Sequence, residues 1–168
     1  LKDSIFEKYL SDKDIKFKHY SNKALHVDNS RLYILNDTSS YVYKNFDSNN
    51  KSGIIKIIYG KNSFLFVGDA EREAEHFLVS RYNRFLKSDV LKAGHHGSNT
   101  SSTDALLNAV DPSVALISAG IMNKFKHPSQ TVLERMRKRN IDIMRTDLEG
   151  AVILCSNGSE ITKINWRE

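Results

Sequence analysis

Apolar and polar positions along this 168-residue chain follow two different periods. From residue 53 onward, short apolar runs typical of strands alternate with segments whose apolar side chains recur every three or four positions, which is typical of amphipathic helices. Such alternation predicts a mixed-sheet α/β fold with helices covering a sheet face. The predicted strands are 53–59, 63–67, 89–93, 113–118, 141–145, 151–155 and 161–164, and the predicted helices are 70–86, 103–110 and 129–139.

The first fifty residues are less regular. Residues 2–12 have a helical pattern, and residues 47–52 form a polar loop. Short strand patterns cover residues 15–20, 24–27 and 31–35. We find neither an internal repeat nor a long linker, so the length predicts one ordinary domain or part of a larger one.

Composition and charge narrow the class of protein. The chain is 40% hydrophobic and 27% charged, which is typical of a globular domain with a sizeable core. The formal net charge of +5 favours an anionic substrate, although a lysine-rich surface without a function gives the same charge. No apolar run is long enough to cross a bilayer, so we expect a soluble domain, which a longer parent protein could attach to a membrane. The single cysteine, Cys155, excludes an internal disulfide, and its apolar strand predicts that it packs in the core.

Three predicted strands end in residues that can carry chemistry. In α/β sheets ligands bind beyond the carboxyl ends of the strands, and histidine is the commonest ligand of transition metals. The strand ends deliver Asp69, then His95 and His96 between two glycines, and then a loop with Asn123, Lys124 and His127. Simpler roles stay open: Asp69 as a helix N-cap, the histidines as packed core residues, and the third segment as a surface loop.

Several motifs stand in register: Asn49-Asn50-Lys51-Ser52, Gly68-Asp69-Ala70-Glu71, Gly94-His95-His96-Gly97-Ser98, Ser118-Ala119-Gly120 with Asn123 and His127-Pro128, and Arg145-Thr146-Asp147 with Gly150. Their order and spacing resemble the metallo-β-lactamase-fold domain of the ComEC-type DNA-uptake family, from about residue 49 to about residue 153. The resemblance implies an αββα sandwich with a mixed sheet and outer helices, of which residues 1–168 are the C-terminal part. It also implies a site at the sheet edge for one or two Zn²⁺ or Mn²⁺ ions.

The resemblance assigns roles to individual residues. Asp69 matches the aspartate that bridges two metal ions, and the histidine pair matches the last metal-binding histidine, with His95 preferred to His96. Catalytic roles fall to Asp69 and His127, and substrate binding falls to Ser98, Asn123, Lys124 and His127.

One part of the family pattern is missing from this sequence. The His-x-His-x-Asp-His signature does not occur, and His19, His26 and His76 lack its spacing. We therefore expect an incomplete metal site, because a hydrolytic centre needs more ligands than one carboxylate and one or two histidines. The absent N-terminal half of the domain, or another subunit, would complete it.

The resemblance implies metal-assisted hydrolysis of a phosphodiester, with DNA as the leading substrate. Lys92, Lys124 or His127 would bind a phosphate oxygen. Two other classes stay open. One is a hydrolase of a small ester, lactone or cyclic nucleotide on the same fold, and the other is a non-catalytic module that binds nucleic acid or a partner.

Overall fold

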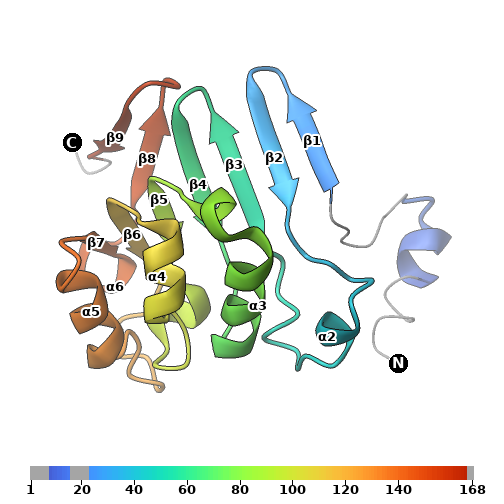
Figure 1. The fold of residues 1–168 in the computed structure, drawn as a ribbon. Helices are drawn as coiled ribbons and strands as arrows, with labels where there is room; N and C mark the ends of the chain where they lie inside the picture. The colour runs from blue at the N-terminus through green and yellow to red at the C-terminus, as the bar shows by residue number, and fades with distance from the viewer. Residues whose placement is uncertain (1–7, 16–22, 166–168) are drawn as a thin grey trace.

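A seven-stranded mixed sheet forms the centre of the molecule, and a separate two-stranded sheet lies beside it (Figure 1). The structure is a computed structural model that describes residues 8–15 and 23–165. The strands of the large sheet follow one another in sequence order. They are β1 (Lys23–Val27), β2 (Ser30–Ile34), β3 (Ile55–Tyr59), β4 (Asn62–Phe66), β5 (Val90–Lys92), β6 (Val114–Ile117) and β7 (Asp142–Arg145).

The sheet changes from antiparallel to parallel pairing at β4. Strands β1 to β4 pair antiparallel, whereas β4 to β7 pair parallel. Because parallel strands end at the same edge, the residues that follow β4, β5 and β6 come together at one edge of the sheet. The polar segments that end these three strands are therefore neighbours in space.

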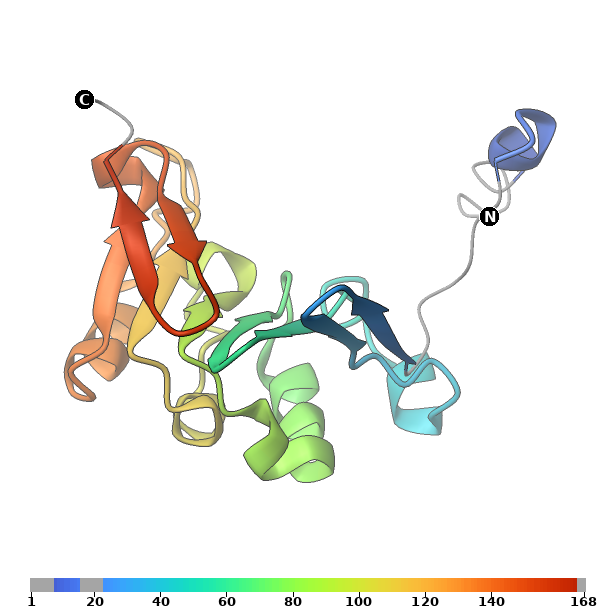
Figure 2. The same cartoon turned by 90° about the horizontal axis from the view of Figure 1, so that it is seen from above.

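Helices connect the parallel strands. Figure 2 shows α3 (Arg72–Tyr82) and α4 (Asp104–Val110) on the same side of the sheet. Their apolar residues form one core with residues of the strands, among them Leu78, Leu106, Leu107, Leu65 and Leu91. None of the helices among the described residues has the length and apolar composition of a bilayer-spanning segment. The remaining elements are α2 (Tyr41–Lys44), α3 (Arg72–Tyr82), η1 (Asn83–Leu86), η2 (Gly94–Gly97), α4 (Asp104–Val110), α5 (Gln130–Arg137), α6 (Thr146–Glu149), β8 (Ile153–Ser156) and β9 (Ile161–Ile164).

The opposite face of β3 and β4 is apolar and only partly covered. Ile55 pairs with Phe66 and Ile57 pairs with Phe64 across the two strands. All four side chains are partly buried, whereas Leu65, which points to the helices, is completely buried. We call these four residues the open apolar face. A sheet of this apolar character is expected to have cover on both sides.

The mixed α/β fold predicted from the sequence is confirmed. Thr103 and Ser129 cap α4 and α5, because their side chains accept hydrogen bonds from N–H groups in the first turns of these helices. The predicted helix 70–86 is shorter, because Asn83 leaves helical geometry and a 3₁₀ turn follows. Residues 8–12 are helical, and the strand predicted at 15–20 lies almost wholly outside the described residues.

The prediction that Cys155 packs in the core is wrong, because this side chain is exposed. Its strand, β8, pairs only with β9 among the described strands, and alternate residues of this small hairpin face solvent. The apolar residues around Cys155 were therefore not sufficient to predict its burial.

Candidate functional site

A tight turn after β4 presents Asp69 at the sheet edge. Gly68 has a φ of +57°, and a Cβ atom there would lie 2.6 Å from Cβ of Ser52. The same serine accepts a hydrogen bond from the backbone N–H of Asp69 through its Oγ atom, at 3.0 Å. The turn thus needs glycine, and it fixes the backbone that carries the Asp69 carboxylate.

The alternative role of Asp69 as a helix N-cap is wrong. Helix α3 has Glu71 at its N-cap position. The Oδ1 atom of Asn50 accepts hydrogen bonds from the N–H groups of Glu71 and Ala74, at 2.9 and 3.3 Å, and so caps the helix from another loop. The Asp69 side chain is 42% exposed and does not serve the helix end.

The two histidines occupy a strained turn after β5. His95 has φ 44° and ψ 48°, and His96 has φ 55° and ψ 22°, which places both in the left-handed region. Such a conformation costs of order 1–3 kcal/mol for each non-glycine residue, and it clusters at functional sites. The turn is held by bonds from His95 N–H to the carbonyl of Gly68 and from Ser98 N–H to the carbonyl of His95, at 3.1 and 2.9 Å.

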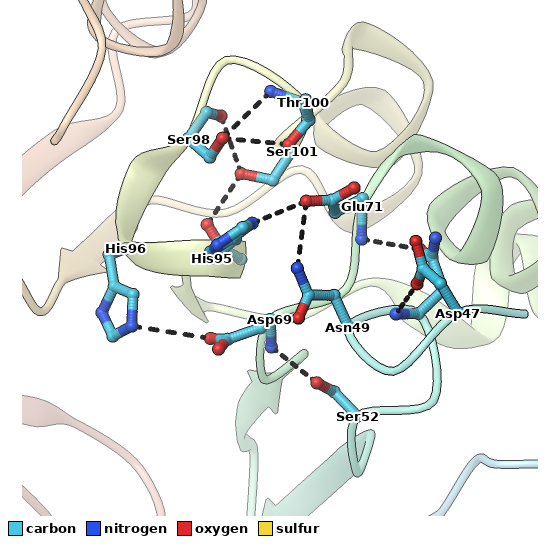
Figure 3. Close-up of polar contacts among 12 residues, drawn as sticks. Asp47, Asn49, Ser52, Asp69, Glu71, His95, His96, Ser98, Thr100 and Ser101 are labelled. Carbon is cyan, nitrogen blue, oxygen red and sulfur yellow. Dashed lines mark hydrogen bonds and ion pairs between the residues drawn. The ribbon is translucent and has the colours of Figure 1, made fainter. Parts of the chain in front are cut away.

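The contacts pair Asp69 with His96. The Nε2 atom of His96 lies 3.7 Å from Oδ1 of Asp69 (Figure 3). On the other side of the ring, Nδ1 lies 2.7 Å from the carbonyl oxygen of Ser118. A carbonyl only accepts, so Nδ1 carries the proton, and Nε2 of the neutral ring keeps its lone pair on the Asp69 side. A backbone carbonyl orients metal-binding histidines in the same way.

His95 is paired with a different carboxylate. Its Nδ1 atom donates to Oε1 of Glu71 at 2.7 Å, and Nδ2 of Asn49 reaches the same oxygen at 3.3 Å. Figure 3 shows the two histidine rings directed apart, His95 toward Glu71 and His96 toward Asp69. Sequence reasoning gave Glu71 and Asn49 no role. The signal that could have found Glu71 is a second carboxylate two residues after Asp69 in the same turn.

The third predicted segment is a loop held by Asn123. Its Nδ2 atom donates to the carbonyls of Gly120 and His127, at 2.9 and 2.7 Å, and its Oδ1 accepts from His127 N–H at 2.9 Å. The His127 ring stacks on Phe125 with centroids 5.8 Å apart, and lies 5.8 Å from the His95 ring. Burial lowers the pKa of His127, and positive charge on His95 and His96 lowers it further.

An open cavity of about 370 Å³ adjoins the histidines. This size is within the range of small-molecule sites. His96 lines the cavity and also lies 3.7 Å from Asp69, so this side chain is common to the cavity and to the Asp69–His96 pair. Its lining includes His96, Ser118, Ala119, Asn123, Phe125 and His127.

The other predicted substrate residues are placed differently. Ser98 is 5% exposed, and its hydroxyl bonds to that of Thr100 at 2.9 Å, within the segment that follows the histidine turn. Lys124 is close to Phe125, with Nζ 4.9 Å from the ring centre. The ammonium group of Lys92 donates to the carbonyl of Ala93, and burial lowers its pKa although Asp69 acts in the opposite direction. The roles of these residues in substrate binding stay predictions.

The described residues do not make up a metal centre by themselves. Within residues 8–15 and 23–165, no three His, Cys, Asp or Glu side chains are grouped closely enough to hold a metal ion. Asp69 and His96 are one pair, whereas catalytic zinc sites have three protein ligands. Which histidine would bind a metal stays a prediction, although the geometry favours His96.

Comparison with known proteins finds a family match that includes both the turn that carries Asp69 and the turn that carries the two histidines. Residues 45–121 match the metallo-beta-lactamase superfamily. The chain is 45% identical over 109 residues to the competence protein ComA of Neisseria gonorrhoeae, an alignment that covers 65% of this chain and 16% of that protein.

Two further relatives are the ComE operon protein 3 of Bacillus subtilis, 36% identical over 104 residues, and recombination protein 2 of Haemophilus influenzae, 40% identical over 104 residues. Each alignment covers 62% of this chain and 13% of the relative. The chain therefore corresponds to a small part of these longer proteins.

Proposed function

We propose that the domain in this chain hydrolyses phosphodiester bonds in DNA. It is a metallo-β-lactamase domain related to the competence proteins, and it corresponds to a part of those longer chains. The observation that carries the proposal is the convergence of Asp69 and His96 at 3.7 Å, from turns that follow two parallel strands. The superfamily is typically metal-dependent.

Asp69 and His96 would contribute two ligands to a site for Zn²⁺ or Mn²⁺, and other ligands would come from outside the described residues. A bound metal ion would stabilise negative charge on the phosphoryl group. The role of this chain is to hold the two ligands in place. Ser52 accepts a hydrogen bond from the Asp69 backbone, and the Ser118 carbonyl accepts one from the His96 ring.

We propose that a further half of the domain supplies the missing ligands and covers the open apolar face. Two observations support this. The face of Ile55, Ile57, Phe64 and Phe66 is apolar and incompletely buried. The relatives are also much longer than the aligned region, so they have room for the second half. Another subunit could fill the same place.

The charge around the cavity supports an anionic substrate. No acidic residue occurs between Asp111 and Glu134, whereas Lys124, Lys126 and His127 all lie in that interval. The ammonium groups of the two lysines would bind phosphate oxygens. His127, whose pKa is lowered by burial, would act as an uncharged hydrogen-bond donor. The name of the Neisseria relative, a competence protein, favours DNA over other phosphodiesters. The moderate size of the cavity favours a second candidate, a small ester or cyclic nucleotide.

The experiment uses the full-length protein that contains this domain, supplied with Zn²⁺ or Mn²⁺. Cleavage of a labelled DNA strand is measured beside cleavage of a cyclic nucleotide and a small ester. We expect DNA cleavage in the wild type, and its loss in Asp69→Asn and His96→Ala. His76→Ala is the matched control, since His76 is an exposed residue of α3. DNA cleavage that persists in both site variants would exclude the proposal.

A further inference from the structure

The cavity beside His96 has an aromatic side chain in its wall. Phe125 is 65% exposed although it is a large apolar residue, and it lines the same cavity as His96. We propose that Phe125 is a stacking platform for an unpaired nucleobase next to the phosphate that is cleaved. This inference rests on the proposed function, and it narrows the substrate to DNA with an unstacked base.

The position of the ring fits a nucleotide. His96 lines the cavity and lies 3.7 Å from Asp69, where the reacting phosphate would lie. Phe125 and His127 form a stacked pair in the cavity wall, with ring planes only 17° apart. A base that follows the phosphate into the cavity would therefore meet an aromatic surface. Aromatic side chains on which bases stack are the usual device for binding single strands.

The loop is already organised around this ring. Asn123 closes it with three hydrogen bonds to Gly120 and His127, so the backbone on both sides of Phe125 is fixed. Lys124 places its ammonium group over the ring, 4.9 Å from the ring centre, so a base that stacks on Phe125 would displace this flexible side chain and keep its positive charge nearby. Aromatic surface together with positive charge suits a nucleotide better than an uncharged apolar ligand.

The cavity wall is better suited to stacking on a base than to recognising its edge through hydrogen bonds. The Ser118 carbonyl already accepts from His96, and the N–H and carbonyl of Ala119 both bond to the hydroxyl of Thr146. The Asn123 amide is engaged within its loop. With these polar groups occupied, discrimination among the four bases through hydrogen bonds is weak. We expect a site that needs a base but tolerates any sequence.

The test measures binding rather than cleavage. The full-length protein in an Asp69→Asn background, which protects the probe, is titrated against fluorescein-labelled oligothymidylate and an abasic oligonucleotide of the same length. One stacked base is worth roughly 5- to 150-fold in affinity. We expect a preference for oligothymidylate of this size. Phe125→Leu, which keeps apolar bulk without a ring, should bring the ratio to about one, and Phe125→Trp should retain it.

Tyr41→Leu is the matched control, because Tyr41 is 81% exposed on α2, at the other end of the sheet (Figure 1). It should leave the ratio unchanged. Equal binding of both probes by the unsubstituted Phe125 protein, binding of neither probe, or a Phe125→Leu protein with an unchanged ratio would each overturn the inference. Cleavage of oligothymidylate by the protein with the wild-type Asp69 reports on the proposed function separately. Absence of that cleavage together with an intact base preference would remove the hydrolytic role and keep the stacking site.

Discussion

Glu71 and His95 are joined by a contact of 2.7 Å between Oε1 and Nδ1. This pair lies next to a second one, Asp69 with His96 at 3.7 Å. Each carboxylate comes from the turn after β4, and each histidine comes from the turn after β5. The two strands thus deliver two carboxylate–histidine pairs side by side, and the two histidines face different partners.

The first prediction separates the two histidines. In the full-length protein, His96→Ala should remove more metal than His95→Ala, because of these two histidines His96 is the one beside Asp69. This reverses the preference for His95 drawn from sequence. Metal content after dialysis, measured by mass spectrometry, checks it. His76→Ala should retain all of the metal. A His96→Ala protein with a full metal content, beside a depleted His95→Ala protein, would restore His95 as the ligand.

Glu71→Gln tests the orientation of His95. The amide can present a donor where the carboxylate accepts, so the His95 ring should lose its fixed position. Loss of the partner that orients a metal-ligating histidine typically costs about 10- to 100-fold in metal affinity or activity. Because the geometry favours His96 as the ligand, we expect a smaller loss for Glu71→Gln. Metal titration and DNA cleavage measure the effect, with the exposed neighbour Glu73→Gln as control. Equal values for both variants would show that the contact has no consequence.

Gly68→Ala should destabilise the turn that carries Asp69. The new Cβ would meet Ser52 at 2.6 Å, at a φ of +57°. We expect a loss of about 1–3 kcal/mol in the free energy of unfolding, measured by urea denaturation. In Gly120→Ala the nearest atom would be 3.9 Å away, so that control should lose little. A Gly68→Ala protein as stable as the control would contradict the role given to this glycine.

Glu75 is a buried carboxylate that holds the segment after the histidine turn. Its two oxygens accept from the N–H groups of Ser102 and Thr103, at 2.5 and 2.7 Å. Glu75→Ala leaves two buried donors without this acceptor, at about 1–3 kcal/mol for each. Denaturant unfolding should show this loss for Glu75→Ala and little change for the exposed Glu73→Ala.

The same residue gives a dependence on pH. Burial raises the pKa of Glu75 above its ordinary value, in spite of the bonds to Ser102 and Thr103. A group with a raised pKa in the folded state contributes stability below its unfolded pKa, and this contribution is lost as pH rises through the folded pKa. The stability of wild type relative to Glu75→Gln should therefore fall as pH rises above about 4.5. If the stability of wild type relative to Glu75→Gln rose with pH instead, the folded protein would favour the charged form of Glu75.

Residues 1–168 produced alone should self-associate through the open apolar face. Burial of apolar area contributes about 25 cal/mol per Å², so the exposed parts of Phe64 and Phe66 favour association. Light scattering should show species larger than a monomer, and Phe64→Glu should reduce them. Tyr41→Glu, far from this face, is the control. A monodisperse monomer at high concentration would argue against a missing cover.

The order of strands β3 to β9, the helices α3, α4 and α5 between them and the residues at the strand ends could be predicted from the sequence, whereas the short helix α6 was not predicted. The predicted features are local properties. Periodicity reports which side of an element is buried, and a polar residue after an apolar strand is visible without knowledge of neighbours. Asp69, His95 and His96 could be proposed as one site because consecutive parallel strands end at the same edge.

How those residues pair could not be predicted from the sequence, because the pairing depends on contacts made in the folded chain. The left-handed backbone at His95 and His96 turns the two rings apart, and no periodicity shows such a turn. Asn50 caps α3 from another loop, which leaves the carboxylate of Asp69 free of that role. Cys155 has an apolar sequence around it but is exposed, since burial depends on what packs against a strand. Contacts between segments distant in sequence fix all three, and such contacts exist only once the chain has folded.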